Sequence, residues 1–120
     1  MERTHKVVEK YFNCHNHTMY SNLRLLDCIN RPKELIDKAI ELGLTGIAIT
    51  DHECLSAHMT VNKIAKEYRE KYPDFTIALG NEIYLIEERS PQKQHYFHFI
   101  VIAKDELGYK ALKELSSIAW

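Results

Sequence analysis

Apolar residues in the first half of the chain recur at spacings that predict a strand, a helix and a second strand. A short apolar run at 10–15 predicts the first strand. The helix that follows is predicted to take Asn30 as its N-cap, to hold Pro32 in its first turn and to end at Gly43. Residues 46–50 contain hardly any polar side chain, which is typical of a parallel strand buried on both faces.

The second half of the chain continues this alternation and adds a hairpin. Residues 56–72 carry an apolar stripe at helical spacing, which Pro73 ends. Three strands are expected next, at 75–79, 82–87 and 96–103. Gly80-Asn81 is expected to break the chain between the first two, and the last two to form a hairpin. Asp105 then caps a final helix. The order β-α-β-α-β-β-β-α predicts an α/β fold of mostly parallel strands with an inserted hairpin.

Length, charge and cysteine content narrow the class of protein. The 120 residues suit one domain or part of a larger one, and a net charge of −1 indicates no broad basic surface for nucleic acid. The apolar runs are too short to span a membrane, and no apolar signal region opens the chain. Three cysteines without paired spacing are typical of reduced thiols, so we expect a cytoplasmic location.

Histidines and carboxylates stand where the predicted strands begin or end. The first strand ends at His15 and His17, which project to the same side because alternate residues of a strand share a face. The second strand ends at Asp51-His52. Further along, Glu82 follows the third strand, and His98 opens the second strand of the hairpin. Taken singly, each group has a plainer interpretation, as a helix cap or a solvated surface residue. Together they favour a site for divalent metal ions.

The residue types narrow the chemistry of this site. Mixed imidazole and carboxylate ligands suit Zn, Mn or Fe and do not choose among them. Several such ions can activate a bound water and hold phosphate oxygens. Asp51 is expected to accept a hydrogen bond from a metal-bound imidazole instead of binding metal itself. Cys14 is expected to be a buried, inert thiol, and His58 and His95 to lie at the surface or the edge of the core.

Four stretches of the chain resemble the PHP (polymerase and histidinol phosphatase) domain, in the form found at the N-terminal end of bacterial DNA polymerase III alpha subunits. They are Phe12-Asn-Cys-His-Asn-His-Thr-Met-Tyr-Ser21, Leu25-Leu-Asp27 with the helix after it, Gly46-Ile-Ala-Ile-Thr-Asp-His52 and Ala78-Leu-Gly-Asn-Glu-Ile-Tyr84. A fifth, His98-Phe-Ile-Val-Ile-Ala103, resembles the next motif of that polymerase. The resemblance covers nearly the whole chain from residue 11 onward.

The resemblance implies a fold and a set of ligands. PHP domains are distorted seven-stranded (β/α) barrels with a trinuclear metal centre. Residues 11–120 would form the N-terminal portion of such a barrel, with 1–10 as a lead-in. The resemblance implies that the C-terminal part of the barrel, with the family's later ligands, would lie beyond Trp120. The metal ligands carried over by position are His15, His17, Asp27, His52, Glu82 and His98. We expect His52 and Glu82 to act in catalysis as well.

Three functions follow from the resemblance. The first is a portion of a replicative polymerase alpha subunit whose parent site hydrolyses phosphoesters, in some members as a 3′–5′ exonuclease. Its partners would be the rest of that subunit and, through the parent polymerase, DNA. The second is a structural module with a degenerate site that braces the polymerase. The third is a stand-alone phosphatase of the histidinol type. Because a partial barrel exposes strand edges, we also expect self-association.

Overall fold

The computed structural model describes residues 10–23, 26, 28–90, 92 and 95–120. Four strands form one sheet in the order β1-β2-β3-β4. Their bounds are Phe12–Asn13 for β1, Gly46–Ile49 for β2, Thr76–Leu85 for β3 and Phe97–Ile102 for β4. Strands β1, β2 and β3 run parallel, and β4 pairs antiparallel with β3. The predicted α/β fold with parallel strands and one hairpin is therefore confirmed.

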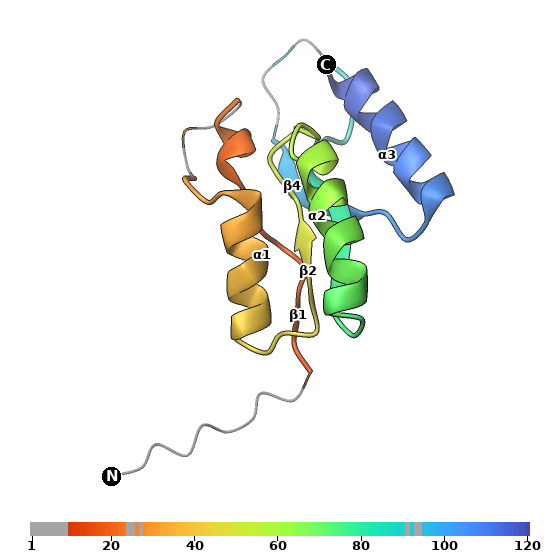
Figure 1. Ribbon diagram of the computed structural model, residues 1–120. Coiled ribbons are helices and arrows are strands. Elements are labelled where there is room, and N and C mark those ends of the chain that lie inside the picture. Colours follow the sequence, from red (N-terminus) through yellow and green to blue (C-terminus); the bar gives the residue numbers. More distant parts are fainter. Residues whose placement is uncertain (1–9, 24–25, 27, 91, 93–94) are drawn as a thin grey trace.

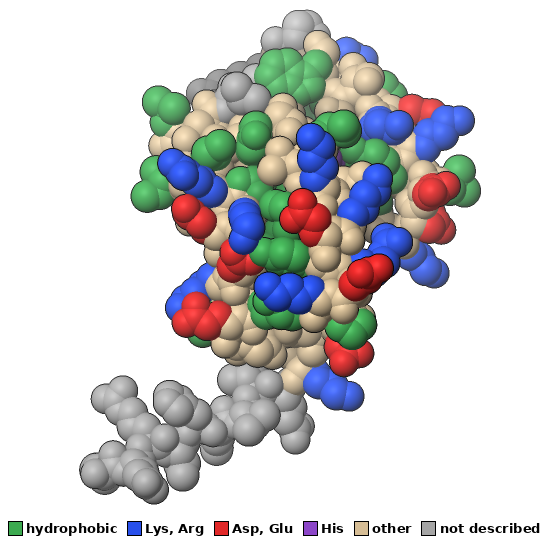
Figure 2. Space-filling view, in the orientation of Figure 1, with side chains coloured by type: hydrophobic (Ala, Val, Ile, Leu, Met, Phe, Trp, Pro, Cys, Tyr) green, Lys and Arg blue, Asp and Glu red, His purple; other side chains and the backbone are tan. Residues whose placement is uncertain are grey.

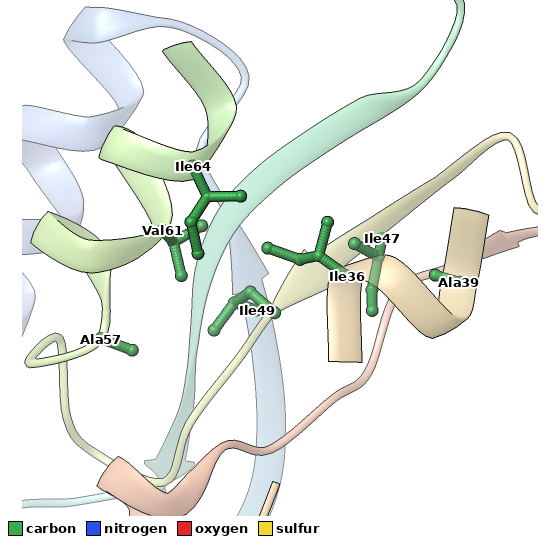
Figure 3. Close-up of a cluster of buried hydrophobic side chains, with 7 residues drawn as sticks. All are labelled: Ile36, Ala39, Ile47, Ile49, Ala57, Val61 and Ile64. Atoms are coloured by element: carbon green, nitrogen blue, oxygen red, sulfur yellow. The ribbon is translucent and has the colours of Figure 1, made fainter. Parts of the chain in front are cut away.

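Two helices, α1 (Pro32–Glu41) and α2 (His58–Lys71), lie side by side over β2 (Figure 1). Apolar side chains from both helices and from β2 form the core, because β2 is buried at every position. Figure 3 shows this cluster, which comprises Ile36, Ala39, Ile47, Ile49, Ala57, Val61 and Ile64. The 3-10 helix η1 (Met19–Leu23) precedes α1, and α3 (Glu106–Ala119) follows β4. This core packs against β2, at whose end the candidate site begins.

The strand break expected at Gly80-Asn81 is wrong, because β3 runs without interruption through both residues. Gly80 is needed there for a different reason. A Cβ atom at this position would lie 2.5 Å from the backbone oxygen of Val101 and 2.9 Å from the Thr50 side chain. The glycine therefore permits β4 and the end of β2 to approach β3 closely.

The ends of the elements match the sequence in part. The first strand is shorter than predicted, since only Phe12–Asn13 pair with β2. Arg31, and not Asn30, is the N-cap of α1, although Pro32 does occupy the first turn. Gly43 has φ +75°, the left-handed conformation expected after a helix C-terminus. Asp105 caps α3 as predicted, because its side chain accepts a hydrogen bond from the Gly108 N–H at 2.8 Å.

Two expectations about burial are wrong. His58 is buried at the start of α2, where its Nε2 lies 2.9 Å from the Gly80 carbonyl oxygen and its Nδ1 lies 3.3 Å from the Tyr109 hydroxyl. Burial therefore lowers the pKa of this imidazole, although the bond to Gly80 partly opposes the shift. Cys14 is exposed, because β1 ends before it and no regular strand turns its side chain inward.

The outer face of α1 and α2 carries mixed charge. Acidic and basic side chains alternate over both helices in Figure 2, as expected for the solvated side of amphipathic helices. Within the described ranges, no helix is both long enough and apolar enough to cross a membrane.

Candidate metal centre

Five of the six sequence-predicted ligands meet at one place, where four histidines surround the carboxylate of Glu82 in β3. His15 Nε2 lies 2.9 Å and His17 Nε2 2.5 Å from Glu82 Oε2. His52 Nε2 lies 3.5 Å from the same oxygen. On β4, the antiparallel neighbour of β3, His98 Nδ1 lies 2.7 Å from Glu82 Oε1. The sixth predicted ligand, Asp27, falls outside the described residues.

The converging atoms form two groups that share Glu82. One group comprises His15, His17 and Glu82, and the other comprises His52, Glu82 and His98. Within each group the potential ligand atoms lie within 4.8 Å of one another. Because a carboxylate has two oxygens, one shared carboxylate can bind two metal ions, which in two-metal sites lie about 3.5–4 Å apart. The arrangement therefore suits two adjacent cation sites better than one.

Within the first group, the spacing of the two histidines fits a shared metal ion, whereas Glu82 Oε2 lies at hydrogen-bond distance from both. His15 Nε2 and His17 Nε2 are 3.2 Å apart. Two ligands of one tetrahedral metal with bonds of about 2.0–2.1 Å would be separated by about 3.3–3.4 Å. The two imidazole nitrogens therefore lie close to the separation that shared coordination requires. The donor set, with nitrogen and carboxylate oxygen ligands, is also one that divalent metals accept.

The carboxylate at the centre of the site is buried, whereas two of the surrounding imidazoles are exposed. The Glu82 side chain is 4% exposed, whereas those of His15 and His98 are 54% and 50% exposed. Burial alone raises the pKa of the Glu82 carboxyl group. Hydrogen bonds from the imidazoles of His15, His98 and His17 outweigh that effect and lower this pKa from 4.5 to about 2. The site thus holds a fixed negative charge at its floor and two accessible imidazoles at its rim.

Asn16 fastens the loop that carries His15 and His17 to β2. Its side-chain amide donates to the Asn13 and Ala48 carbonyl oxygens, at 3.0 Å each. Its backbone N–H donates to the Thr50 hydroxyl at 3.0 Å, and its carbonyl oxygen accepts from the Thr50 N–H at 2.8 Å. These bonds continue the β1–β2 pairing beyond the regular strand, so the two histidines keep the shared orientation that strand alternation predicts.

Asp51 supports the same loop, in a way that the sequence did not reveal. Its fully buried carboxylate accepts from the Thr18 N–H at 2.5 Å, the Thr18 hydroxyl at 2.8 Å and the Ser21 hydroxyl at 2.9 Å. The Ser21 hydroxyl oxygen in turn accepts from the His52 N–H at 3.1 Å. The expected bond from Asp51 to an imidazole is therefore replaced by bonds that tie the residue after His17 to the residue before His52.

The backbone brings His52 and Glu82 together beyond the regular strands. The two residues form an isolated parallel bridge. The Glu82 N–H donates to the Asp51 carbonyl oxygen at 3.0 Å, and the Glu53 N–H donates to the Glu82 carbonyl oxygen at 2.8 Å. Glu53 adopts φ +42°, a conformation that non-glycine residues seldom take. The chain therefore turns away from the sheet directly after placing His52.

Sequence reasoning missed the polar residues that support the site, namely Asn16, Thr18 and Ser21. The only local signal is that these small polar residues closely follow the two histidines. An open pocket of about 320 Å³ lies on this side of the site, lined by His15, Asn16, His17, Cys28 and Asn30. The Cys28 thiol donates to the His17 carbonyl oxygen at 3.1 Å, so it helps to hold the loop.

This constellation can be compared with known proteins. The family model of the PHP domain matches residues 13–120. The chain belongs to the PHP domain family. The earlier resemblance is therefore confirmed, and the five converging residues lie in the stretches on which it was based.

Relatives of this PHP domain are DNA polymerases. It is 41% identical over 117 residues to a DNA-directed DNA polymerase of Bacillus phage SPbeta, a match that covers 89% of this chain and 9% of that protein. It is 33% identical over 108 residues to the DNA polymerase III alpha subunit of Treponema pallidum, covering 85% of this chain and 9% of that protein. The PHP domain thus spans about a tenth of the length of these relatives.

A solved structure supports the fold. A protein from Bifidobacterium adolescentis, described as a metal-dependent phosphoesterase, superposes with a TM-score of 0.60 at 22% sequence identity. The match covers 88% of this chain and 33% of that protein. At this identity the likeness concerns the fold, and it agrees with a partial PHP barrel.

Proposed function

We propose that this PHP domain binds divalent metal ions at the Glu82 centre and hydrolyses phosphoesters there, as part of a polymerase of the alpha-subunit type. The observation that carries the proposal is the pair of ligand groups that share one buried carboxylate. The polymerase relatives favour a phosphodiester of DNA as substrate, with cleavage in the 3′–5′ direction. Zn, Mn and Fe all suit the donor set. A cytoplasmic location agrees with a role in DNA replication and stays a prediction.

The position of each residue in the site indicates its role in binding metal or substrate. Glu82, with its low pKa, stays ionised at neutral pH and supplies the charge that holds cations. When bound, divalent metals lower the pKa of a coordinated water towards neutrality and neutralise phosphate oxygens. His15 and His98 line the open side by which a phosphoester would enter. His52, 6% exposed, is held deeper in the site, where a proton on its ring is shielded from bulk water.

Metal content after reconstitution tests the site. The purified chain is stripped with a chelator, incubated with Mn²⁺, Zn²⁺ or Fe²⁺, desalted and analysed for bound metal. We expect the wild type to retain metal after desalting. Glu82→Gln and His17→Ala should retain less, because each is expected to weaken the affinity for the metal at least tenfold. His95→Ala is the matched control, because His95 is an exposed histidine outside both ligand groups. Equal metal content in all four proteins would refute the proposal.

Hydrolysis is tested on the same proteins with bis(p-nitrophenyl) phosphate and with single-stranded oligonucleotides. Activity that Glu82→Gln abolishes and His95→Ala retains is the expected result. Bound metal without any hydrolysis would leave the metal site intact and reject the enzymatic role.

A bracing role is the second candidate, and exposed apolar side chains favour it. On β4, Phe97 and Phe99 are 57% and 50% exposed, and on α3, Leu107 and Ile118 are 77% and 65% exposed. Strand β4 also lies at the edge of the described sheet. Such surfaces are typical of contacts with other domains or with a second copy. The predicted self-association is tested by the mass in solution, and a monomer at micromolar concentration would contradict it.

A further inference from the structure

Two tyrosines stand directly beside the metal centre, and the ligand geometry leaves them without a role. Tyr84 is two residues beyond Glu82 on β3, so both side chains lie on the same face of the strand. Tyr84 is also the cross-strand partner of His98. Tyr96 lies just before β4, two residues ahead of His98, and its ring centroid lies 6.1 Å from that of His98. The two tyrosines therefore extend the face of the sheet that carries the candidate ligands.

Ring contacts place this pair one side chain away from the ligands. The Tyr84 ring centroid lies 4.9 Å from that of His98 and 6.2 Å from that of His52. The Tyr96 ring lies 4.7 Å from Tyr84, at an interplanar angle of 67°. Tyr96 is nevertheless 57% exposed. The edge-to-face arrangement consequently leaves a large part of an aromatic ring open to solvent next to the centre.

We propose that Tyr84 and Tyr96 form a stacking subsite for the nucleobase that adjoins the phosphodiester held at the centre. This inference rests on the proposed function and adds a determinant of specificity to it. Open tyrosine rings are the usual platforms on which the bases of single strands stack, because every base has a flat π face. The Tyr96 ring lies 6.1 Å from the His98 ring, and His98 Nδ1 lies 2.7 Å from Glu82 Oε1, so a base stacked on Tyr96 would adjoin a phosphate bound at Glu82. Tyr84 positions the exposed Tyr96 ring by the contact between them.

The opposite face of β4 offers a matched control. Phe97 is adjacent to Tyr96, is also 57% exposed and projects away from the ligands because strand neighbours alternate. If exposed aromatic rings bound the probe nonspecifically, or if hairpin stability controlled binding, Phe97→Ala would weaken probe binding as much as Tyr96→Ala. A stacking subsite would appear in Tyr96→Ala alone. Because stacking uses the ring and not the hydroxyl group, Tyr96→Phe would retain it.

The test measures binding without turnover. Two fluorescein-labelled single-stranded probes share a run of five thymidylates and carry a phosphorothioate at the last linkage, which slows cleavage. One ends in thymine and the other in an abasic tetrahydrofuran residue. Fluorescence anisotropy with the Mn²⁺-loaded chain is expected to give tighter binding of the thymine-ended probe by roughly 5- to 100-fold. Tyr96→Ala is expected to bring this ratio close to one, whereas Tyr96→Phe and Phe97→Ala keep it.

Several outcomes would overturn the subsite. They are equal binding of the two probes by the wild type, no binding of either, an unchanged ratio in Tyr96→Ala, or an equal loss in Phe97→Ala. The result is independent of hydrolysis. A base preference in a chain that cleaves nothing would support the subsite and reject the enzymatic role. Cleavage without a base preference would do the reverse.

Discussion

Replacing Asp51 tests how the site is held together. In Asp51→Ala three donors lose their acceptor: the Thr18 N–H, the Thr18 hydroxyl and the Ser21 hydroxyl. The two hydroxyl groups can rotate toward other acceptors, but the backbone N–H cannot. At about 1–3 kcal/mol for each orphaned buried group, three orphans would cost ~3–9 kcal/mol, and because the two hydroxyls can find other acceptors we expect the lower part of that range, ~3–5 kcal/mol, as the loss in the free energy of unfolding. Domains of this size are stable by only ~5–15 kcal/mol, so the effect is large.

Asp51→Asn removes the charge of the side chain but keeps its shape, so it measures the contribution of the charge alone. The amide oxygen can replace Oδ1, which accepts from the Thr18 N–H and the Ser21 hydroxyl, while the Thr18 hydroxyl rotates to accept from the amide nitrogen. Neutral hydrogen bonds then replace charge-assisted ones of about twice their strength, so we expect a cost of ~1–2 kcal/mol.

Urea denaturation followed by circular dichroism measures both variants, with unchanged m-values as the check on two-state unfolding. If Asp51→Ala cost less than ~1 kcal/mol, or if the two substitutions cost the same, the account of Asp51 as the buried acceptor for this loop would be refuted.

Two further predictions concern residues that the sequence had misassigned. Because burial lowers the pKa of His58, its neutral form is favoured in the folded state. Stability should therefore fall as the pH drops below about 6.5, where the unfolded chain takes up the proton first. Urea midpoints at neutral and mildly acidic pH should show a shallower decline in His58→Gln, and an unchanged decline would count against the assignment. Gly80→Ala should cost ~1–3 kcal/mol, since its new Cβ would meet the Val101 backbone oxygen at 2.5 Å. Thermal unfolding would measure it, and a stability equal to that of the wild type would show that β3 and β4 can separate without cost.

Local patterns were sufficient for most of the architecture. The unbroken apolar run at 46–50 predicted a buried parallel strand, and β2 is buried at every position. The final helix and its cap Asp105 followed from spacing and residue type. Periodicity and capping depend on neighbours within a few residues, so a single sequence carries them. The convergence of these groups could be predicted because parallel strands bring their carboxyl ends to one edge, although Glu82 lies within β3 and not after a strand end as expected.

The choice of partners was decided only by the tertiary structure. The sequence by itself determined that His15, His17, His52, Glu82 and His98 would stand near one edge of the sheet. The register between β3 and β4 determines that one carboxylate, that of Glu82, belongs to both ligand groups. The path of the loop after His17 determines that Asp51 contacts Thr18 and not an imidazole. The burial of His58 and the continuity of β3 through Gly80 likewise depend on packing between segments that lie far apart along the chain. Residue types and their positions indicated which groups meet at this centre. Which atoms touch was determined by the fold, because hydrogen-bond geometry and close packing join residues that are distant in the sequence.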